Sequence, residues 1–130
     1  MFQFCWSHDG WLVEIKSEEK EHLVEEVIVP EIAYWIGLTD FAQEGDFVWA
    51  KSYEKTNYTD WYGQEPSRGR YEDCVFKSKL EGKEGWFDYN CDSTAVESWG
   101  INIHALCEAD NTFLESNIRG LNQDHISDLI

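Results

Sequence analysis

The chain has 130 residues, of which 10 are basic and 26 acidic, giving a formal net charge of −16. This length predicts one domain with a substantial core. The negative charge argues against nucleic acid, heparin or an anionic membrane surface as a partner, and no apolar run is long enough to insert into a membrane. Seven tryptophans make the chain aromatic-rich; we expect Trp35, Trp49 and Trp86, which lie in strand-like runs, to be core residues.

Four cysteines are present, none in a C-x-x-C pair and none with a histidine at ligand spacing. This pattern argues against zinc and predicts two disulfides, for which the sequence alone allows three pairings. Disulfides persist in an oxidising compartment. Residues 1–4 lack the basic and apolar regions of a signal peptide. We therefore interpret the chain as an incomplete record of a secreted protein, or a domain of a longer one.

In chain order, a short apolar run at 11–15 comes before Ser17, which is a suitable helix N-cap. A helix is predicted from about 17 to 28, ended by Pro30, with a packing role. Residues 33–38 and 47–49 have the β-branched and aromatic composition of buried strands.

Residues 50–72 form a polar, turn-rich stretch of a length that is usually functional. Residues 73–77 and 85–88 then predict a strand pair joined by a flexible turn. The tail from 109 to 130 can dock, oligomerise or stay disordered.

Oxygen-bearing side chains gather around Pro66 and near the second predicted strand: Glu65, Ser67, Glu72 and Asp88. Oxygen ligands drawn from separate loops suit Ca²⁺, which tolerates irregular geometry. If the Glu65–Pro66 bond is cis, Glu65 and Ser67 can point the same way. Calcium is therefore the first hypothesis for a cofactor.

Five motifs occur in a characteristic order: Trp-Ile-Gly-Leu-Thr-Asp at 35–40 followed by Glu44-Gly45, Glu-Pro-Ser at 65–67, Glu-Asp-Cys at 72–74, Trp-Phe-Asp at 86–88 and Ala-Leu-Cys-Glu at 105–108. Over residues 5–108 the sequence resembles the C-type lectin domain. The resemblance implies an α+β fold with small antiparallel sheets, one or two helices, a long calcium-binding loop region and two disulfides. It also implies the pairs Cys5–Cys107 and Cys74–Cys91.

The same resemblance sets the expected domain boundaries. A C-type lectin-like domain is expected at 1–108, with its first strand and most of its first helix missing before Cys5, and a C-terminal tail at 109–130. Residues 96–102 look inserted relative to the family.

By resemblance, the sugar-binding calcium would be held by Glu65, Ser67, Glu72 and Asp88. Phe87 stands where the family has an asparagine that ligates calcium and donates a hydrogen bond to the sugar; we expect Phe87 at a half-exposed rim of the site. A second calcium site would use Asp40, Glu44 and Asp73 with the backbone carbonyl of Glu72, and Arg68 replaces a further acidic ligand there.

The function implied is calcium-dependent binding of glycans or glycoproteins by a secreted, extracellular protein in innate recognition. Glu65, at the first position of the Glu-Pro-Ser triplet, resembles the residue found in family members of the mannose, fucose and N-acetylglucosamine class. A calcium-independent, protein-binding domain is the alternative, and the oligomeric state stays open. An enzyme would use Glu65 and Asp88 as a glycosidase pair, but nothing supplies a deep cleft, so we expect no enzyme. Asn57-Tyr58-Thr59 is the single N-glycosylation sequon, with Asn57 as its acceptor.

Overall fold

The computed structural model describes residues 1–67, 72–109, 112–115 and 125–128. The helices are α1 (Phe2–Ser7), α2 (Glu18–Val27) and the 3-10 turn η1 (Glu97–Trp99). The strands are β1 (Trp11–Leu12), β2 (Ile32–Thr39), β3 (Val48–Trp49), β4 (Cys74–Leu80), β5 (Lys83–Tyr89), β6 (Ala95–Val96), β7 (Ile101–Ala109), β8 (Thr112–Glu115) and β9 (His125–Asp128). The predicted helix and strands are therefore present, with β4 and β5 longer than expected.

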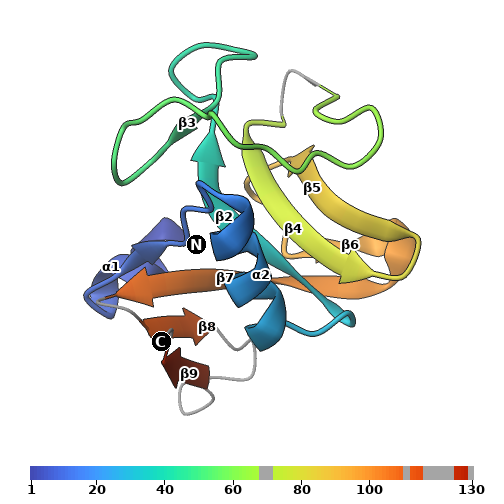
Figure 1. Cartoon of the computed structure of the whole chain (residues 1–130). Helices are drawn as coiled ribbons and strands as arrows, with labels where there is room; N and C mark the ends of the chain where they lie inside the picture. Colours follow the sequence, from blue (N-terminus) through green and yellow to red (C-terminus); the bar gives the residue numbers. More distant parts are fainter. Residues whose placement is uncertain (68–71, 110–111, 116–124, 129–130) are drawn as a thin grey trace.

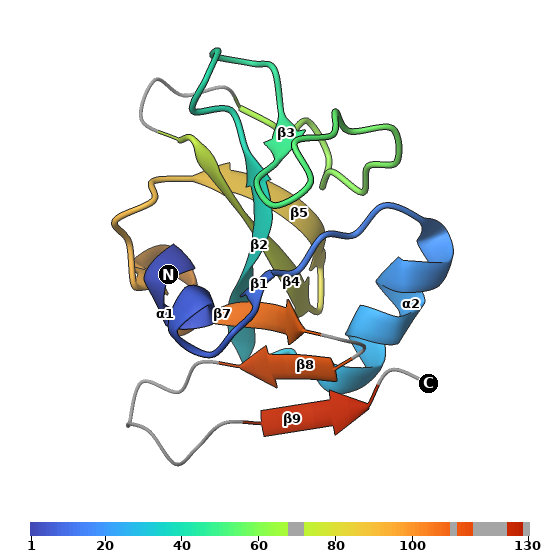
Figure 2. The ribbon, with the colours of Figure 1, turned by 90° about the vertical axis from the view of Figure 1, so that its left-hand side faces the viewer.

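The strands form a curled sheet in the order β5-β4-β2-β7-β8-β9, with β1 and β6 paired to β7 and β3 to β2. All of these pairs are antiparallel except β2 with β7, which is parallel. The loops between β3 and β4 lie at the end of the molecule opposite β8 and β9 (Figures 1 and 2). The expected α+β architecture is confirmed.

Two apolar layers cover the two faces of this sheet because alternate strand residues point to opposite sides. In β2, Tyr34 and Ile36 join the layer under α2, whereas Ala33 and Trp35 join the layer on the α1 side. The two helices accordingly lie on opposite sides of β2 (Figure 2). Trp35, Trp49 and Trp86 are all buried, as predicted.

Helix α2 begins where the sequence indicates. The Ser17 side chain accepts a hydrogen bond from the Lys20 amide at 3.1 Å and so caps the first turn. Val24 is fully buried, and the helix ends at Val27, before Pro30. Among the described residues there is no helix long and apolar enough to cross a membrane.

Both predicted disulfides are confirmed. Cys5–Cys107 joins α1 to β7 and Cys74–Cys91 joins β4 to the segment after β5, with Cα–Cα distances of 5.5 and 5.1 Å. The chain-entropy argument assigns about 4 to 5 kcal/mol to the longer loop and about 3 kcal/mol to the shorter one.

The segments without an expected role take part in packing. Strand β8 pairs with β7 and buries Phe113 in the layer under α2, so the sheet continues across the boundary expected at residue 108. In the 96–102 segment, the Trp99 ring lies edge-on to Phe76 and Phe87 at centroid distances of 5.6 and 5.0 Å. This segment therefore covers the apolar layer on the α1 side.

Candidate functional site

The start of the loop region is held by a buried carboxylate from another part of the chain. Glu14 is 5% exposed, and its Oε2 accepts hydrogen bonds from the amides of Lys51 and Ser52 at 2.7 and 3.1 Å. Its Oε1 lies 3.2 Å from Lys16 Nζ. Glu14 thus fixes the backbone just after β3, a role that the apolar run at 11–15 did not suggest.

Further along, the loop is attached to β5. The Tyr62 amide donates to the Trp86 carbonyl at 3.0 Å, and the Trp86 amide donates to the Asp60 carbonyl at 2.8 Å. At Gly85, whose φ is +141°, an added Cβ would lie 2.9 Å from the Asp60 carbonyl oxygen, so glycine permits this close approach. The attachment brings residues 65–67 beside the end of β5.

The four predicted ligands of the first calcium site come together around Ser67. The Glu65–Pro66 bond is cis. The Ser67 amide donates to Asp88 Oδ1 at 2.8 Å and to Glu65 Oε1 at 3.1 Å. Ser67 Oγ lies 2.5 Å from Glu72 Oε1 and 3.0 Å from Asp88 Oδ1. Three carboxyl groups and one hydroxyl therefore surround a single point of the loop.

The proximity of these carboxyl groups changes their acidity. Burial, a hydrogen bond with Asp88 and the negative charges of Asp88 and Glu72 raise the pKa of Glu65 to about 7, while the Ser67 amide opposes the rise. Two carboxylates this close favour a proton between them or a bound cation. Hard oxygen donors with this mutual repulsion fit Ca²⁺.

A second acidic cluster joins the end of β2 to the start of β4. Carboxylate oxygens of Asp40, Glu44 and Asp73 lie within 4.8 Å of one another. Asp40 Oδ2 accepts from the Gly45 amide at 2.8 Å, whereas Asp40 Oδ1 is buried without a hydrogen-bond partner. Burial is the main cause that raises the pKa of both Asp40 and Asp73. A buried oxygen with no donor is a further feature that a cation would satisfy. Arg68 lies outside the described residues.

Comparison with known proteins identifies the family. The sequence model of the Lectin C-type domain matches residues 1–96. The chain belongs to the C-type lectin family. The low affinity immunoglobulin epsilon Fc receptor of Mus musculus is 33% identical over 105 residues, which cover 80% of this chain and 30% of the receptor. The chain thus spans less than a third of that relative.

Solved structures agree with this family. The carbohydrate-recognition domain of the mouse scavenger receptor C-type lectin has a TM-score of 0.63 and 29% identity, covering 71% of this chain and 72% of that one. The carbohydrate-recognition domain of cow CD23, in the presence of a GlcNAc2Man3 oligosaccharide, has a TM-score of 0.60 and 31% identity, covering 69% and 67%. The family and these neighbours are binding proteins and not enzymes, in agreement with the expectation of no enzyme.

One residue of this C-type lectin domain lies elsewhere than expected. Phe87 is 8% exposed, so the expectation of a half-exposed rim is wrong. Its ring stacks between Tyr62 and Phe76, at centroid distances of 4.9 and 5.2 Å. Phe87 is therefore part of the apolar layer on the α1 side and takes no place among the oxygen ligands.

A third acidic group in this lectin domain contains its own cation. Carboxylate oxygens of Glu21, Glu25 and Asp60 lie within 4.8 Å of one another, but Lys77 Nζ forms an ion pair with Glu21 and lies 3.0 Å from Glu25 Oε2. Lys77 is 1% exposed. The ammonium group pairs with two of the three carboxylates, so its role is structural: it ties α2 to β4 beneath the loops. No sequence pattern indicated this pair, because a lysine within a strand is usually a solvent-facing residue.

Proposed function

We propose that this C-type lectin domain binds Ca²⁺ through Glu65, Ser67, Glu72 and Asp88, and binds glycans at that ion. The observation that carries the proposal is the convergence of the carboxylates of Glu65, Glu72 and Asp88 on the amide and hydroxyl of Ser67, with distances of 2.5 to 3.1 Å. In this arrangement a cation would replace the short contacts between carboxyl groups.

The ion would supply direct coordination of sugar hydroxyls. The residues of the chain would fix the sugar's orientation, because a carboxylate such as Glu65 accepts a hydrogen bond from a hydroxyl whose oxygen is held by the metal. Phe87 contributes no donor here, so we expect fewer hydrogen bonds to the sugar and a weak affinity for a single residue.

We further propose that Asp40, Glu44 and Asp73 hold a second Ca²⁺ that steadies the loops. Its support is the buried Asp40 Oδ1, which has no hydrogen-bond partner. Because Asp73 adjoins Glu72, an ion at this cluster would fix the backbone that presents Glu72 to the first site.

The class of sugar is inferred from Glu65 and from a solved structure similar to this chain. We propose mannose, fucose or N-acetylglucosamine residues as ligands, since cow CD23 was solved in the presence of GlcNAc2Man3. The two disulfides support an extracellular, secreted setting, with glycans or glycoproteins of other cells as partners in innate recognition. Asn57 is exposed on the loop after β3, where the sequon could carry a glycan.

The test is a glycan array with calcium and with chelator, on wild-type protein, on Glu65→Gln and on a matched control, Glu97→Gln. Both variants remove one negative charge, but Glu97 is exposed on η1 and belongs to neither calcium cluster. We expect wild type and Glu97→Gln to bind mannose-type glycans only with calcium, and Glu65→Gln to lose this binding. Equal binding with chelator, or none in either buffer together with capture of a protein ligand, would favour calcium-independent protein recognition instead.

A further inference from the structure

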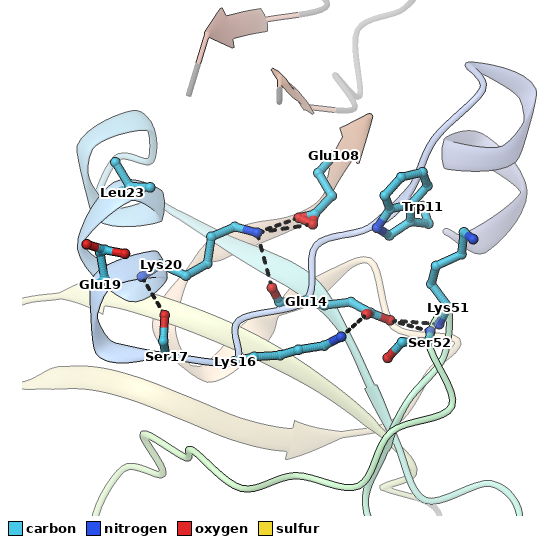
Figure 3. A pocket seen from close by; sticks show the side chains of 10 residues that line it. All are labelled: Trp11, Glu14, Lys16, Ser17, Glu19, Lys20, Leu23, Lys51, Ser52 and Glu108. Carbon is cyan, nitrogen blue, oxygen red and sulfur yellow. Dashed lines mark hydrogen bonds and ion pairs between the residues drawn. The ribbon is translucent and has the colours of Figure 1, made fainter. Parts of the chain in front are cut away.

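A separate cavity of about 560 Å³ lies between the 11–17 segment, the first turns of α2 and the loop after β3. Figure 3 shows its lining, which includes Trp11, Glu14, Lys20, Lys51 and Glu108. None of its residues belongs to either calcium cluster. The proposed calcium-dependent function therefore does not involve this cavity.

One wall of the cavity is aromatic. The Trp11 indole is half-buried, and Lys51 Nζ lies 5.0 Å from its ring centroid. Lys51 itself is exposed, so its flexible side chain can swing away and uncover the ring. An indole face in a cavity of this size offers a stacking surface for a flat, partly apolar ligand.

The opposite wall carries alternating hydrogen-bond donors and acceptors. Lys20 Nζ lies 2.7 Å from Glu108 Oε1 and 3.3 Å from the Glu14 carbonyl oxygen. Lys16 Nζ lies beside the Glu14 carboxylate. Each ammonium group can donate to a ligand hydroxyl while its carboxylate neighbour accepts from it.

The charges of the lining cancel. Three lysines and three glutamates line the cavity: Lys16, Lys20, Lys51, Glu14, Glu19 and Glu108. The chain as a whole carries −16, so a locally neutral cavity is a departure from the rest of the protein. Balanced charge favours neither an anion nor a cation, but it suits a neutral ligand rich in hydroxyls.

We propose that this cavity is a second, calcium-independent binding site for a neutral saccharide. A pyranose ring combines an apolar C–H face, which would stack on Trp11, with a rim of hydroxyls, which would meet the Lys20–Glu108 and Lys16–Glu14 pairs. The site does not depend on calcium at the Ser67 cluster, so it stands whether or not that proposal holds.

A second hollow extends the site beyond one ring. It measures about 250 Å³, shares Trp11 and Lys51 with the first, and is also lined by Trp6 and Tyr53. Trp6 is 62% exposed and Tyr53 83% exposed. Exposed aromatic faces on the far side of Trp11 would receive a second ring, so the preferred ligand is an oligosaccharide of two or three residues.

The experiment follows the indole N–H signals by NMR in chelator, during titration with chitotriose, mannotriose, laminaritriose and, as an anionic probe, a heparin disaccharide. The Trp11 signal is assigned from a Trp11→Phe variant. We expect at least one neutral trisaccharide to shift this signal with millimolar affinity. Trp11→Ala should weaken its binding roughly tenfold and Tyr53→Ala roughly threefold. Phe41→Ala, an exposed aromatic outside both hollows, and Glu65→Gln should leave binding unchanged.

Three outcomes would overturn the proposal. The first is a Trp11 signal that no neutral trisaccharide shifts at concentrations of about 20 mM, far above a millimolar dissociation constant. The second is a shift with the heparin disaccharide alone, which would make the cavity an anion site. The third is binding that Glu65→Gln abolishes, which would place the sugar at the calcium loop. If Trp11→Ala does not fold, Tyr53→Ala decides, because that side chain is almost fully exposed.

Discussion

Calcium binding by this domain should depend steeply on pH. A carboxyl group must lose its proton to ligate a metal, and the pKa of Glu65 is raised to about 7 by burial and by the neighbouring Asp88 and Glu72. Protonation multiplies the apparent dissociation constant by 1 + 10^(pKa − pH). Between about pH 7.5 and about pH 5.5 this factor grows roughly 25-fold. We therefore expect calcium affinity to fall by about that amount.

Calorimetric titration with calcium at several pH values measures this effect. Glu65→Gln keeps an oxygen at the position but has no proton to lose, so the first site should bind calcium more weakly and with a much flatter pH profile. Glu97→Gln removes the same charge from an exposed position on η1 and should keep the wild-type slope. An unchanged affinity across this range in wild type, or the wild-type slope in Glu65→Gln, would refute the role of Glu65 as a ligand.

The stability of the calcium-free protein should show the opposite trend. The pKa of Glu65 is higher in the folded state than its ordinary value of 4.5. The contribution of the Glu65 carboxyl group to the free energy of unfolding is therefore fully present below about pH 4.5 and is lost as the pH rises through about 7. Calcium bound at the proposed site would remove this loss by neutralising the ionised group. Melting curves with chelator should thus give a falling midpoint between these two pH values, and curves with calcium should not.

Three further changes test the same structure. Calcium at about 10 mM should raise the free energy of unfolding by roughly 1.5 to 3 kcal/mol if its Kd is of the extracellular type, about 10⁻⁴ to 10⁻³ M; urea curves that coincide with and without calcium would contradict this. Phe87→Asn should lower the free energy of unfolding by about 3 to 5 kcal/mol because the ring is buried, and it should not improve calcium affinity. Phe87→Leu should lower the free energy of unfolding by less. A stable asparagine variant with tighter calcium binding would mean that position 87 is a calcium ligand position after all. Lys77→Met should cost about 3 to 5 kcal/mol by leaving Glu21 buried without its cation, and adding Glu21→Gln should restore much of that; a negligible loss in the single variant would mean that the pair adds little.

Local patterns predicted much of the fold. Ser17 and Pro30 bound a helix because capping and the missing proline amide act within a few residues. The paired cysteines and the grouping of Glu65 with Asp88 are different, since they join segments far apart in the chain. They could be predicted because five short motifs in order identify the family and hence its topology.

The buried polar pairs could not be predicted in this way. Lys77 meets Glu25 across 52 positions, and Glu14 meets the Lys51 amide across 37. Both faces of β4 are buried around Lys77, so the alternation that marks an inward or outward side chain is absent there. Only the position of α2 over the strand shows that Lys77 has an acidic partner.

The placement of Phe87 follows from strand geometry more than from motif matching. Strand β5 continues to Tyr89, and in an extended strand neighbouring side chains point to opposite faces. Trp86 belongs to the layer under α2 and Phe87 to the layer on the α1 side, so Asp88 is on the side of Trp86. Of Phe87 and Asp88, therefore, only Asp88 can meet Ser67. An asparagine at 87 would place its amide between Tyr62 and Phe76 unless the strand ended earlier. Under the proposed calcium binding, the ion would therefore take its oxygen ligands from Glu65, Ser67, Glu72 and Asp88 and from solvent.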